Sequence, residues 1–228
     1  IIKGARQIGK TESINHFAEQ NYSNIVSINF VLEPKYKTIL SDGYAVEDII
    51  KNISMIDTSK RFIAGDTVII FDELQEFPDI ATALKSFRID GRFDVICSGS
   101  LLGINYRKIH SNSVGYKTDY EMFSMDFEEF LWAKGYSEKH IEDILKHMQT
   151  GTPFSETELS VYKKLFLEYC VLGGMPAVVK VYIEKNLFTD TLEIQRQIQM
   201  DYEEDIRKYA EGLEQTKIVS VYRNVPVQ

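Results

Sequence analysis

The sequence has few cysteines and no long apolar run. Its two cysteines, Cys97 and Cys170, lie far apart and lack the C-x-x-C spacing of zinc and redox sites. We therefore expect both thiols to lie in the core of a protein from a reducing compartment. No apolar run reaches the length of about 18 residues that a membrane helix needs, and the first residues lack a charged leader before an apolar stretch. These absences argue against a membrane or secreted protein, and we expect a cytoplasmic one.

Several catalytic and binding patterns are also missing. No Ser/His/Asp set or Cys/His pair has the sequence surroundings that nucleophilic catalysis needs. His140 and His147 do not have the H-E-x-x-H spacing, and two helical turns would separate their rings by about 10 Å, so we interpret both as surface residues. The net charge of −8 and the pI near 5.1 disfavour a sequence-independent nucleic-acid coat, which needs clustered Lys and Arg.

What the sequence does contain, within its first residues, is a phosphate-binding pattern. Ile1–Lys3 is typical of the end of a strand, and it leads into G-x-x-x-x-G-K-T. The glycines let the backbone wrap closely around phosphate oxygens and point successive N–H groups at them, beside a helix N-terminus. Lys10 adds a charge for the β- and γ-phosphates, and the Thr11 hydroxyl is placed to ligate Mg²⁺. The predicted nucleotide-binding residues are Gly4, Ala5, Arg6, Gln7, Ile8, Gly9, Lys10 and Thr11.

A parallel α/β sheet is the expected context of this loop. Gly9 to about Gln20 has the apolar spacing of an amphipathic helix, and Ile25–Val31 alternates like a strand. Val46 to about Ile56 predicts a further helix. Thr67–Phe71 is a continuous apolar run, which is typical of a strand buried on both faces of a parallel sheet.

That run ends in Asp72 and Glu73, which match the Walker B pattern. The carboxyl end of such a strand delivers an acid to the nucleotide crevice. We expect Asp72 to hold Mg²⁺ through its water and Glu73 to act as the general base that polarises the attacking water. An acidic turn after a core strand is the alternative interpretation, and the phosphate loop upstream favours the catalytic one.

Phe93–Ser100 predicts a third strand of the site, ending in small polar residues. In a sheet of the additional-strand type, this strand lies between the loop strand and the Walker B strand, so that its tip faces the γ-phosphate. Ser98 or Ser100 is then the candidate for a polar sensor that hydrogen-bonds the attacking water or the γ-phosphate. The S-G-S sequence taken alone is simply a turn. Tyr116–Met125 is a candidate fifth strand.

From Asp126 onward the pattern changes to helices. The expected helices are 127–134, 137–149, 158–172, 177–183 and 188 to about 213. Gly173 and Gly174 break one of them, at what we interpret as a packing turn. The acidic run near residue 203 is interpreted as a solvated helix face with i, i+4 pairs such as Glu203 with Arg207. The sequence thus predicts a nucleotide-binding domain, 1–125, and a helical lid or linker region, 126–228.

Five segments together carry a family resemblance: Gly4–Thr11, Phe71–Gln75, Ser98–Ser100, Asp126–Leu131 and Leu172–Pro176. They resemble the prokaryotic AAA-superfamily ATPases that carry a C-terminal domain of unknown function. The resemblance implies a three-layer P-loop fold with a mostly parallel sheet and a helical lid. It implies ATP as the nucleotide, and no N-K-x-D guanine-reading motif is evident. It also implies a winged-helix or nuclease-like region that begins about where this chain stops, so we expect a piece of a longer protein.

One position departs from that family. The family commonly has Gly-Arg just before the fifth strand, whereas Gly115 is followed here by Tyr116 and Lys117. Lys117 could supply charge, but it lacks the planar fork that suits a transferring phosphoryl group. The alternative donors are Arg88, Arg92 and Arg107, although an arginine is more often a solvated surface charge.

The leading hypothesis is an ATPase that hydrolyses Mg-ATP, with Lys10, Glu73 and Ser98 as catalytic residues and with Thr11 and Asp72 as metal ligands. It would couple the nucleotide state to a C-terminal effector region. The second hypothesis is a switch that binds nucleotide and hydrolyses it slowly or not at all. Nucleotide is the expected partner. A homo-oligomer and a protein partner at the helical region are open, while membranes and nucleic acid are not indicated.

Overall fold

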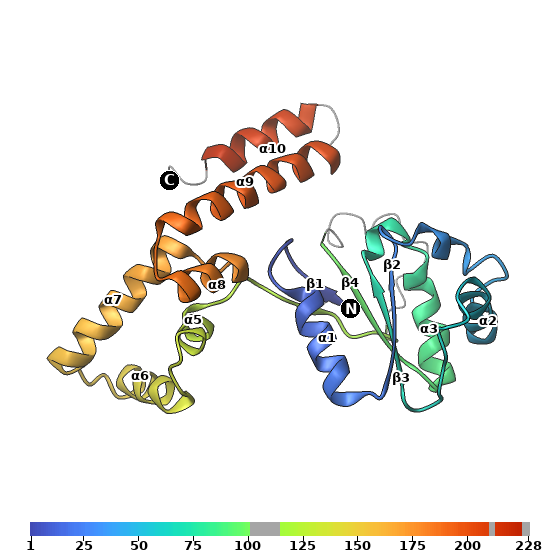
Figure 1. Cartoon of the computed structure of the whole chain (residues 1–228), viewed down its shortest axis with the longest axis horizontal. Helices are drawn as coiled ribbons and strands as arrows, with labels where there is room; N and C mark the ends of the chain where they lie inside the picture. Colours follow the sequence, from blue (N-terminus) through green and yellow to red (C-terminus); the bar gives the residue numbers. More distant parts are fainter. Residues whose placement is uncertain (101–114, 210–212, 225–228) are drawn as a thin grey trace. The chain divides into compact units, whose positions relative to one another are not determined.

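The computed structural model describes residues 1–100, 115–209 and 213–224 of the chain. The chain forms two compact units, Ile1–Phe123 and Ser124–Gln228, and each is described by itself (Figure 1). The first is an α/β unit built on a sheet, and the second consists of helices. Within the described ranges, no helix combines the length and the apolar character needed to cross a bilayer.

Five parallel strands form the sheet of the first unit. In chain order they are β1 (Ile2–Lys3), β2 (Asn24–Asn29), β3 (Thr67–Asp72), β4 (Asp94–Gly99) and β5 (Tyr120–Glu121). Their order in the sheet is β2-β3-β4-β1-β5, and each described pairing is parallel. Strand β4 therefore lies between β1, which enters the phosphate loop, and β3. This is the predicted additional-strand arrangement, and it brings the carboxyl ends of β1, β3 and β4 to one edge of the sheet.

Helices cover both faces of the sheet, and all residues of β3 are therefore buried. The helices of this unit are α1 (Lys10–Asn21), α2 (Val46–Ile56) and α3 (Ile80–Asp90), with the 3₁₀ turns η1 (Pro34–Thr38) and η2 (Leu74–Glu76). Ile69 and Phe71 of β3 pack with α2 and α3, whereas Val68 and Ile70 point to the other face and pack against α1. Figure 1 shows α1 on one side of the sheet and α2 and α3 on the other. The predicted three-layer α/β fold is confirmed.

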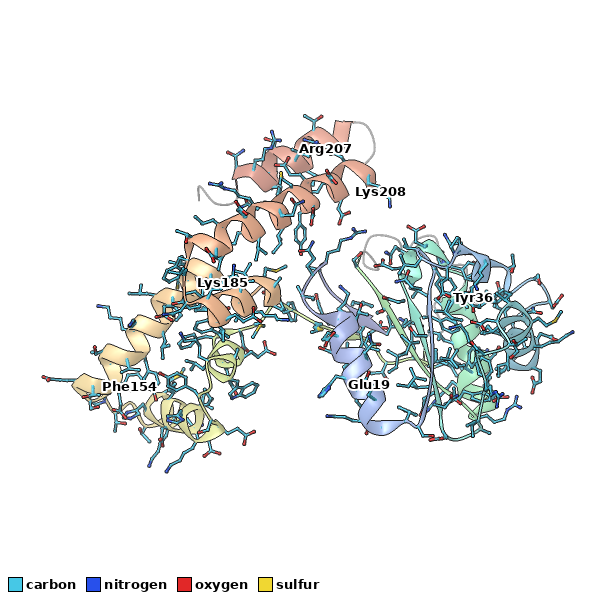
Figure 2. The ribbon with its side chains drawn as sticks, in the orientation of Figure 1. Glu19, Tyr36, Phe154, Lys185, Arg207 and Lys208 are labelled. Atoms are coloured by element: carbon cyan, nitrogen blue, oxygen red, sulfur yellow. The ribbon has the colours of Figure 1, made fainter. Side chains whose placement is uncertain are left out.

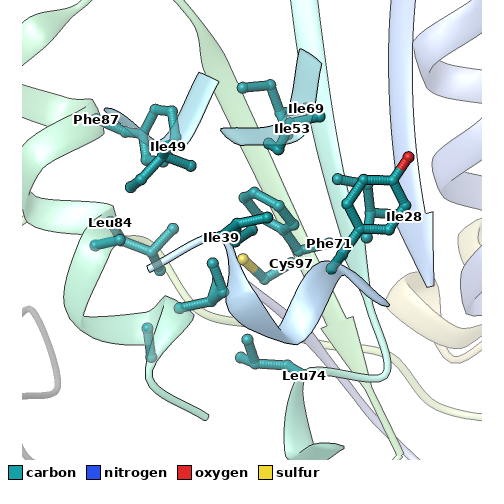
Figure 3. Close-up of a cluster of buried hydrophobic side chains, with 14 of the residues drawn as sticks. Ile28, Ile39, Ile49, Ile53, Ile69, Phe71, Leu74, Leu84, Phe87 and Cys97 are labelled. Atoms are coloured by element: carbon teal, nitrogen blue, oxygen red, sulfur yellow. The ribbon is translucent and has the colours of Figure 1, made fainter. Parts of the chain in front are cut away.

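The larger core of this unit lies on the side of α2 and α3, and it contains Cys97. Figure 3 shows the Cys97 sulfur among the side chains of Ile39, Phe71 and Leu74. Only 1% of Cys97 is exposed, and this burial raises the pKa of its thiol to about 12. The thiol therefore behaves as a small apolar group of the core.

The second unit is all-α, as predicted. Its helices are α5 (Phe127–Ala133), α6 (Glu138–Thr150), α7 (Glu156–Leu172), α8 (Pro176–Lys185), α9 (Thr189–Tyr209) and α10 (Leu213–Asn224). In its main core, Phe130 of α5 packs with residues of α8 and α9. Phe154, labelled in Figure 2, joins α6 to α7, because its ring centroid lies 4.6 Å from that of His147 and 5.5 Å from that of Tyr162.

The break after α7 is a packing turn. The Met125 N–H donates to the Gly174 carbonyl oxygen at 2.8 Å, and a Cβ on Gly174 would lie 1.9 Å from the Met125 carbonyl oxygen. The Tyr169 hydroxyl also donates to that Met125 oxygen, at 2.9 Å. Glycine is required at this close approach, which fixes the chain entering α5 against the end of α7.

Helix α10 is not predicted by the sequence pattern, which places the end of the last helix at about residue 213. Its apolar pattern is weak, and contacts with α9 hold it in place. The rings of Tyr202 and Tyr222 stack at 6.4 Å, and Arg223 Nη2 lies 2.8 Å from a Glu203 carboxylate oxygen. The hydrogen bond from Arg223 lowers the pKa of Glu203. Glu203 also makes the predicted i, i+4 pair, at 3.4 Å from Arg207.

Cys170 corrects one expectation from the sequence. It is exposed on α7, so the prediction that both thiols lie in the core was wrong for this residue. Its neighbours in the sequence are apolar, but α7 buries only Leu165 and Leu172. Apolar neighbours along a helix do not imply burial when most of the helix surface has no packing partner within its unit.

The two thiols should therefore react differently with an aromatic disulfide reagent. At about pH 8, we expect Cys170 to react within minutes and Cys97 to stay protected until the protein is unfolded, because burial and a raised pKa suppress its thiolate. Absorbance of the released thiolate measures both rates. Cys170→Ser is the control, and the native variant should then release almost no thiolate. Rapid native release from Cys170→Ser would contradict the placement of Cys97.

Candidate functional site

The phosphate loop joins β1 to α1, and its backbone requires glycine. Gly4 has a φ of +156°, and a Cβ there would lie 2.2 Å from the Met122 carbonyl oxygen and 2.5 Å from Ile8 Cδ1. Gly9, just before α1, is left-handed with a φ of +93°, and no side chain of the described residues caps that helix. The first N–H groups of α1 therefore form the kind of helix N-terminus that binds phosphate groups.

Lys10 is the first residue of α1 and is 9% exposed. Its Nζ donates to the carbonyl oxygen of Gly4 at 3.1 Å and to that of Ala5. Burial lowers the pKa of Lys10, while the negative charges of Glu73 and Asp72 oppose this shift. The loop lysine and the two carboxylates at the end of β3 therefore share one electrostatic environment.

Asp72 is nearly buried, and four donors surround its carboxylate. Thr11 Oγ1 donates to Oδ2 at 3.4 Å, and Asn29 Nδ2 donates to the same oxygen at 3.2 Å. Oδ1 accepts from the Ser98 hydroxyl and from the Glu73 N–H, the latter at 3.0 Å. The structure thus places the predicted metal ligands, Thr11 and Asp72, within hydrogen-bonding distance of each other.

The two candidate sensor serines have different partners. Ser98 has no exposed surface, and its hydroxyl donates to Asp72. The register of β4 on β3 explains this, because it brings Ser98 beside the end of β3. Ser100, which follows β4, is partly exposed and accepts a hydrogen bond from Arg6 Nε at 3.3 Å. Of the two, Ser100 is the one at the accessible tip.

Asn29, at the end of β2, is a residue of this site that is absent from the predicted site residues. It lies opposite Asp72 in the register of β2 on β3. Its Nδ2 donates to Asp72, and its Oδ1 accepts from the backbone N–H groups of Val31 and Leu32, at 2.9 and 3.0 Å. The carboxamide thus links the turn after β2 to the buried carboxylate. A signal was present, since polar residues at the carboxyl ends of parallel strands meet at one edge.

Glu73 has an uncommon backbone conformation. Its φ is +58°, in the left-handed region that costs a non-glycine residue about 1–3 kcal/mol. Its carboxylate accepts a hydrogen bond from Gln75 Nε2, while Gln75 Oε1 is buried without a hydrogen-bond partner in the described part of the chain. The side-chain amide of Gln75 therefore fixes the position of the Glu73 carboxylate, the predicted general base.

Two of the other predicted cationic groups form ion pairs with acids. Lys117 Nζ lies 2.9 and 2.8 Å from the two carboxylate oxygens of Asp119, which also pairs with Lys3 at 2.8 Å. Although burial acts against it, hydrogen bonds from Lys117 and Lys3 lower the pKa of Asp119. Arg92 pairs with Asp90 at 2.7 Å and with Glu47 at 2.5 Å.

The remaining two arginine candidates differ in what can be said of them. Arg88 is exposed on α3. Arg107 lies outside the described residues.

Comparisons with known proteins agree with this geometry. A family model described as an AAA domain matches residues 1–131, and a model for a domain of unknown function (DUF8612) matches residues 163–228. None of the curated proteins matches the chain. The second match lies within the helical unit, whereas the resemblance placed a further region about where the chain stops.

Two of the solved structures that match this chain come from Aeropyrum pernix and C. elegans. The ORC2 protein of Aeropyrum pernix, in ADPNP-ADP complexes, is 18% identical over 57% of this chain and 42% of that chain, with a TM-score of 0.39. PCH-2 of C. elegans is 11% identical over 79% of this chain and 52% of that chain, with a TM-score of 0.41. This chain therefore spans about half the length of those structures.

Replacing Ser98 by alanine should destabilise the fold, because Asp72 Oδ1 would lose a buried donor. We expect the free energy of unfolding to fall by about 1.5–3 kcal/mol, the usual range for a hydrogen bond to a charged group. Ser27→Ala, at an exposed position of β2, is the matched control and should change that free energy by less than about 0.5 kcal/mol. Urea denaturation followed by circular dichroism measures both. Equal stability of Ser98→Ala and the wild type would contradict the hydrogen-bond network.

Proposed function

The chain belongs to the AAA domain family, and we propose that it binds Mg-ATP at the loop Gly4–Thr11 and hydrolyses the bond between the β- and γ-phosphates. The observation that carries the proposal is that the loop after β1 meets the acids at the end of β3: Thr11 Oγ1 lies 3.4 Å from Asp72 Oδ2, and the charges of Asp72 and Glu73 act on Lys10. Burial of charged groups is costly unless they have partners or a ligand. A loop with a purely structural role would not need a buried lysine near two acids, so the arrangement supports a ligand site.

The loop supplies the phosphate site in this proposal. Its glycines at positions 4 and 9 give the backbone curvature, and the N-terminus of α1 adds its amide groups. Lys10 would exchange its contacts with the Gly4 and Ala5 carbonyl oxygens for phosphate oxygens. This exchange is favourable because a hydrogen bond between two charged groups is stronger than one to a neutral carbonyl.

The metal-binding residues fit Mg²⁺ that arrives with the nucleotide. Asp72 and Thr11 offer hard oxygen donors 3.4 Å apart. No group of three or more His, Cys, Asp or Glu side chains within the described ranges could hold a metal ion by itself. Mg²⁺ is commonly bound by one or two carboxylates together with substrate phosphates. When bound, Mg²⁺ neutralises charge on the phosphate oxygens, and Ser98 and Asn29 keep Asp72 oriented.

Glu73 is the proposed general base. Water attacks the γ-phosphorus, the bond to the bridging oxygen of ADP breaks, and Glu73 accepts the proton of the attacking water. The adjacent Asp72 supports the metal. The products are ADP and inorganic phosphate, and the proton passes from Glu73 to solvent.

A switch that hydrolyses ATP slowly is the second candidate function. Two observations favour it: Gln75 holds the Glu73 carboxylate, and Lys117, one residue beyond the position where the family commonly has arginine, is held by Asp119. In both versions, the helical unit would carry the nucleotide state to a C-terminal effector or a protein partner.

Two substitutions should separate binding from chemistry. Glu73→Gln should lower phosphate release about 10²–10⁴-fold with ATP binding retained, because it removes the base but keeps the shape of the side chain. Lys10→Ala should weaken ATP binding about tenfold or more through the loss of charge-assisted hydrogen bonds. Glu19→Gln, at an exposed position of α1 seen in Figure 2, is the control. If the wild type, Lys10→Ala and Glu73→Gln all release phosphate equally, the catalytic assignment is wrong.

Calorimetry and turnover together decide between the two candidate functions. The ATPase proposal predicts sustained phosphate release by the wild type, above that of Glu73→Gln, at saturating Mg-ATP. Tight ATP binding with negligible turnover at every protein concentration would instead establish the switch. Turnover that rises with protein concentration would indicate an arginine supplied by a second copy of the chain.

A further inference from the structure

The carboxamide of Gln75 is bonded at one end only. Its Nε2 donates to the carboxylate of Glu73, and its Oε1 is buried without a hydrogen-bond partner in the described ranges. The orientation of the amide follows from the chemistry of its partner, because an ionised carboxylate only accepts hydrogen bonds and must therefore face the NH₂ group. The contact that holds the proposed general base thus leaves a polar oxygen of Gln75 cut off from water.

This contact is marginal in free energy. A hydrogen bond to a charged group is stabilising, but a buried carbonyl oxygen that loses its water and gains no donor is destabilising by an amount of similar size. Gln75 is partly exposed, so a rotation of its side chain returns Oε1 to water. The bonded state of Gln75 therefore lies close in free energy to a state in which its side chain has turned toward solvent.

The rest of the segment is fixed and stays in place during such a rotation. Leu74 is fully buried in the core that Figure 3 shows. Glu76 pairs with Lys37 of η1 at 3.3 Å. The Phe77 ring packs edge-on against that of Phe30, with 5.1 Å between the ring centroids. The element with two states is therefore the one side chain between these anchors, and not η2 itself.

We propose that Gln75 is a releasable restraint on the general base, which holds the Glu73 carboxylate before ATP binds and turns away when Mg-ATP is bound. The inference rests on the proposed function and deepens it. The attacking water must donate to the same carboxylate, so it competes with Gln75 for Glu73. Bound ATP positions that water, whereas ADP has no γ-phosphate to be attacked. ATP therefore stabilises the released state through an interaction that exists only in that state.

A restraint of this kind weakens ATP binding and slows hydrolysis. The apparent dissociation constant for ATP is raised because only the released fraction of the molecules is competent to bind the nucleotide together with its attacking water. Molecules that stay restrained with ATP bound do not react. ADP makes no demand on Glu73 and binds both states equally. Removal of the restraint should therefore favour ATP over ADP and raise turnover.

The first experiment replaces Gln75 by methionine, which has a similar length but neither the donor nor the buried carbonyl oxygen. Gln75→Met should raise phosphate release about threefold or more and tighten binding of a non-hydrolysable ATP analogue by a similar factor, with ADP binding unchanged. Its Tm should not fall, because an apolar group replaces an unpaired oxygen. Gln20→Met, at an exposed glutamine of α1, is the matched control and should change none of these values. Lower turnover in Gln75→Met would show that Gln75 positions the base, and would overturn the inference.

A double variant tests whether the effect acts through the base. In the background of Glu73→Ala, Gln75→Met should change neither the single-turnover rate nor the affinity for the ATP analogue, because the carboxylate that Gln75 restrains is gone. Equal gains in both backgrounds would show that the effect is independent of Glu73 and would also overturn the inference.

An NMR measurement tests the release in the wild-type chain, with no substitution at the site. The side-chain amide protons of Gln75, assigned by their absence from Gln75→Met, should show a nuclear Overhauser effect to the methylene protons of Glu73. This effect should be present in the free chain and with Mg-ADP, and it should be lost with Mg²⁺ and the ATP analogue. Its persistence with the ATP analogue would show that ATP does not release Glu73, against the inference.

These outcomes also distinguish the restraint from the proposed function. If the wild type turns over and the Overhauser effect persists with the ATP analogue, the restraint fails and the ATPase stands. If neither the wild type nor Gln75→Met turns over, the ATPase fails, and the Overhauser effect still decides the restraint. Turnover that appears only in Gln75→Met supports the restraint and explains a slow wild type. A chain that binds neither nucleotide removes both.

Discussion

The carboxylate of Asp72 is the constraint on which the site depends. A charge this deeply placed at the end of a buried strand must be compensated by hydrogen bonds, because its removal from water is costly. The compensation comes from α1, β2, β4 and the backbone after β3. The same four bonds that stabilise the charge therefore fix the relative positions of the elements that carry the site. Beneath them, β3 is held on both faces by two separate clusters of apolar side chains.

The site is also organised by opposing charges. Arg6 and Lys10 belong to the loop after β1, whereas Asp72 ends β3 and Glu73 follows it, so cations and anions come from different strands whose ends lie at one edge of the sheet. Fixed charges of this kind stabilise charge that develops on a bound phosphate without reorganising at the moment of reaction. The left-handed backbone of Glu73 lies in the same site. Strain of this kind persists where contacts with the surrounding structure fix the conformation.

Much of the fold could be predicted from the sequence because buried strands leave strong patterns. The apolar run Thr67–Phe71 identified β3, and the loop motif identified Thr11 as a neighbour of the acid that follows. The direction of the Ser98 hydroxyl could not be predicted, because it depends on the register of β4 on β3, which no local pattern encodes. The contact of Asn29 with Asp72 likewise depends on the register of β2 on β3, although the place of Asn29 at a strand end was a usable signal. Helix α10 and the exposure of Cys170 depend on tertiary packing that helical periodicity alone does not reveal.

The close contact between Gly4 and Met122 has a mechanical consequence. Met122 lies at the end of the first unit, its N–H donates to the Lys3 carbonyl oxygen at 2.7 Å, and its own carbonyl oxygen occupies the space that a side chain on Gly4 would need. The polypeptide thus leaves the α/β unit from an anchor on the root of the phosphate loop. The root of the loop and the last residues of the α/β unit therefore cannot shift independently without breaking this contact.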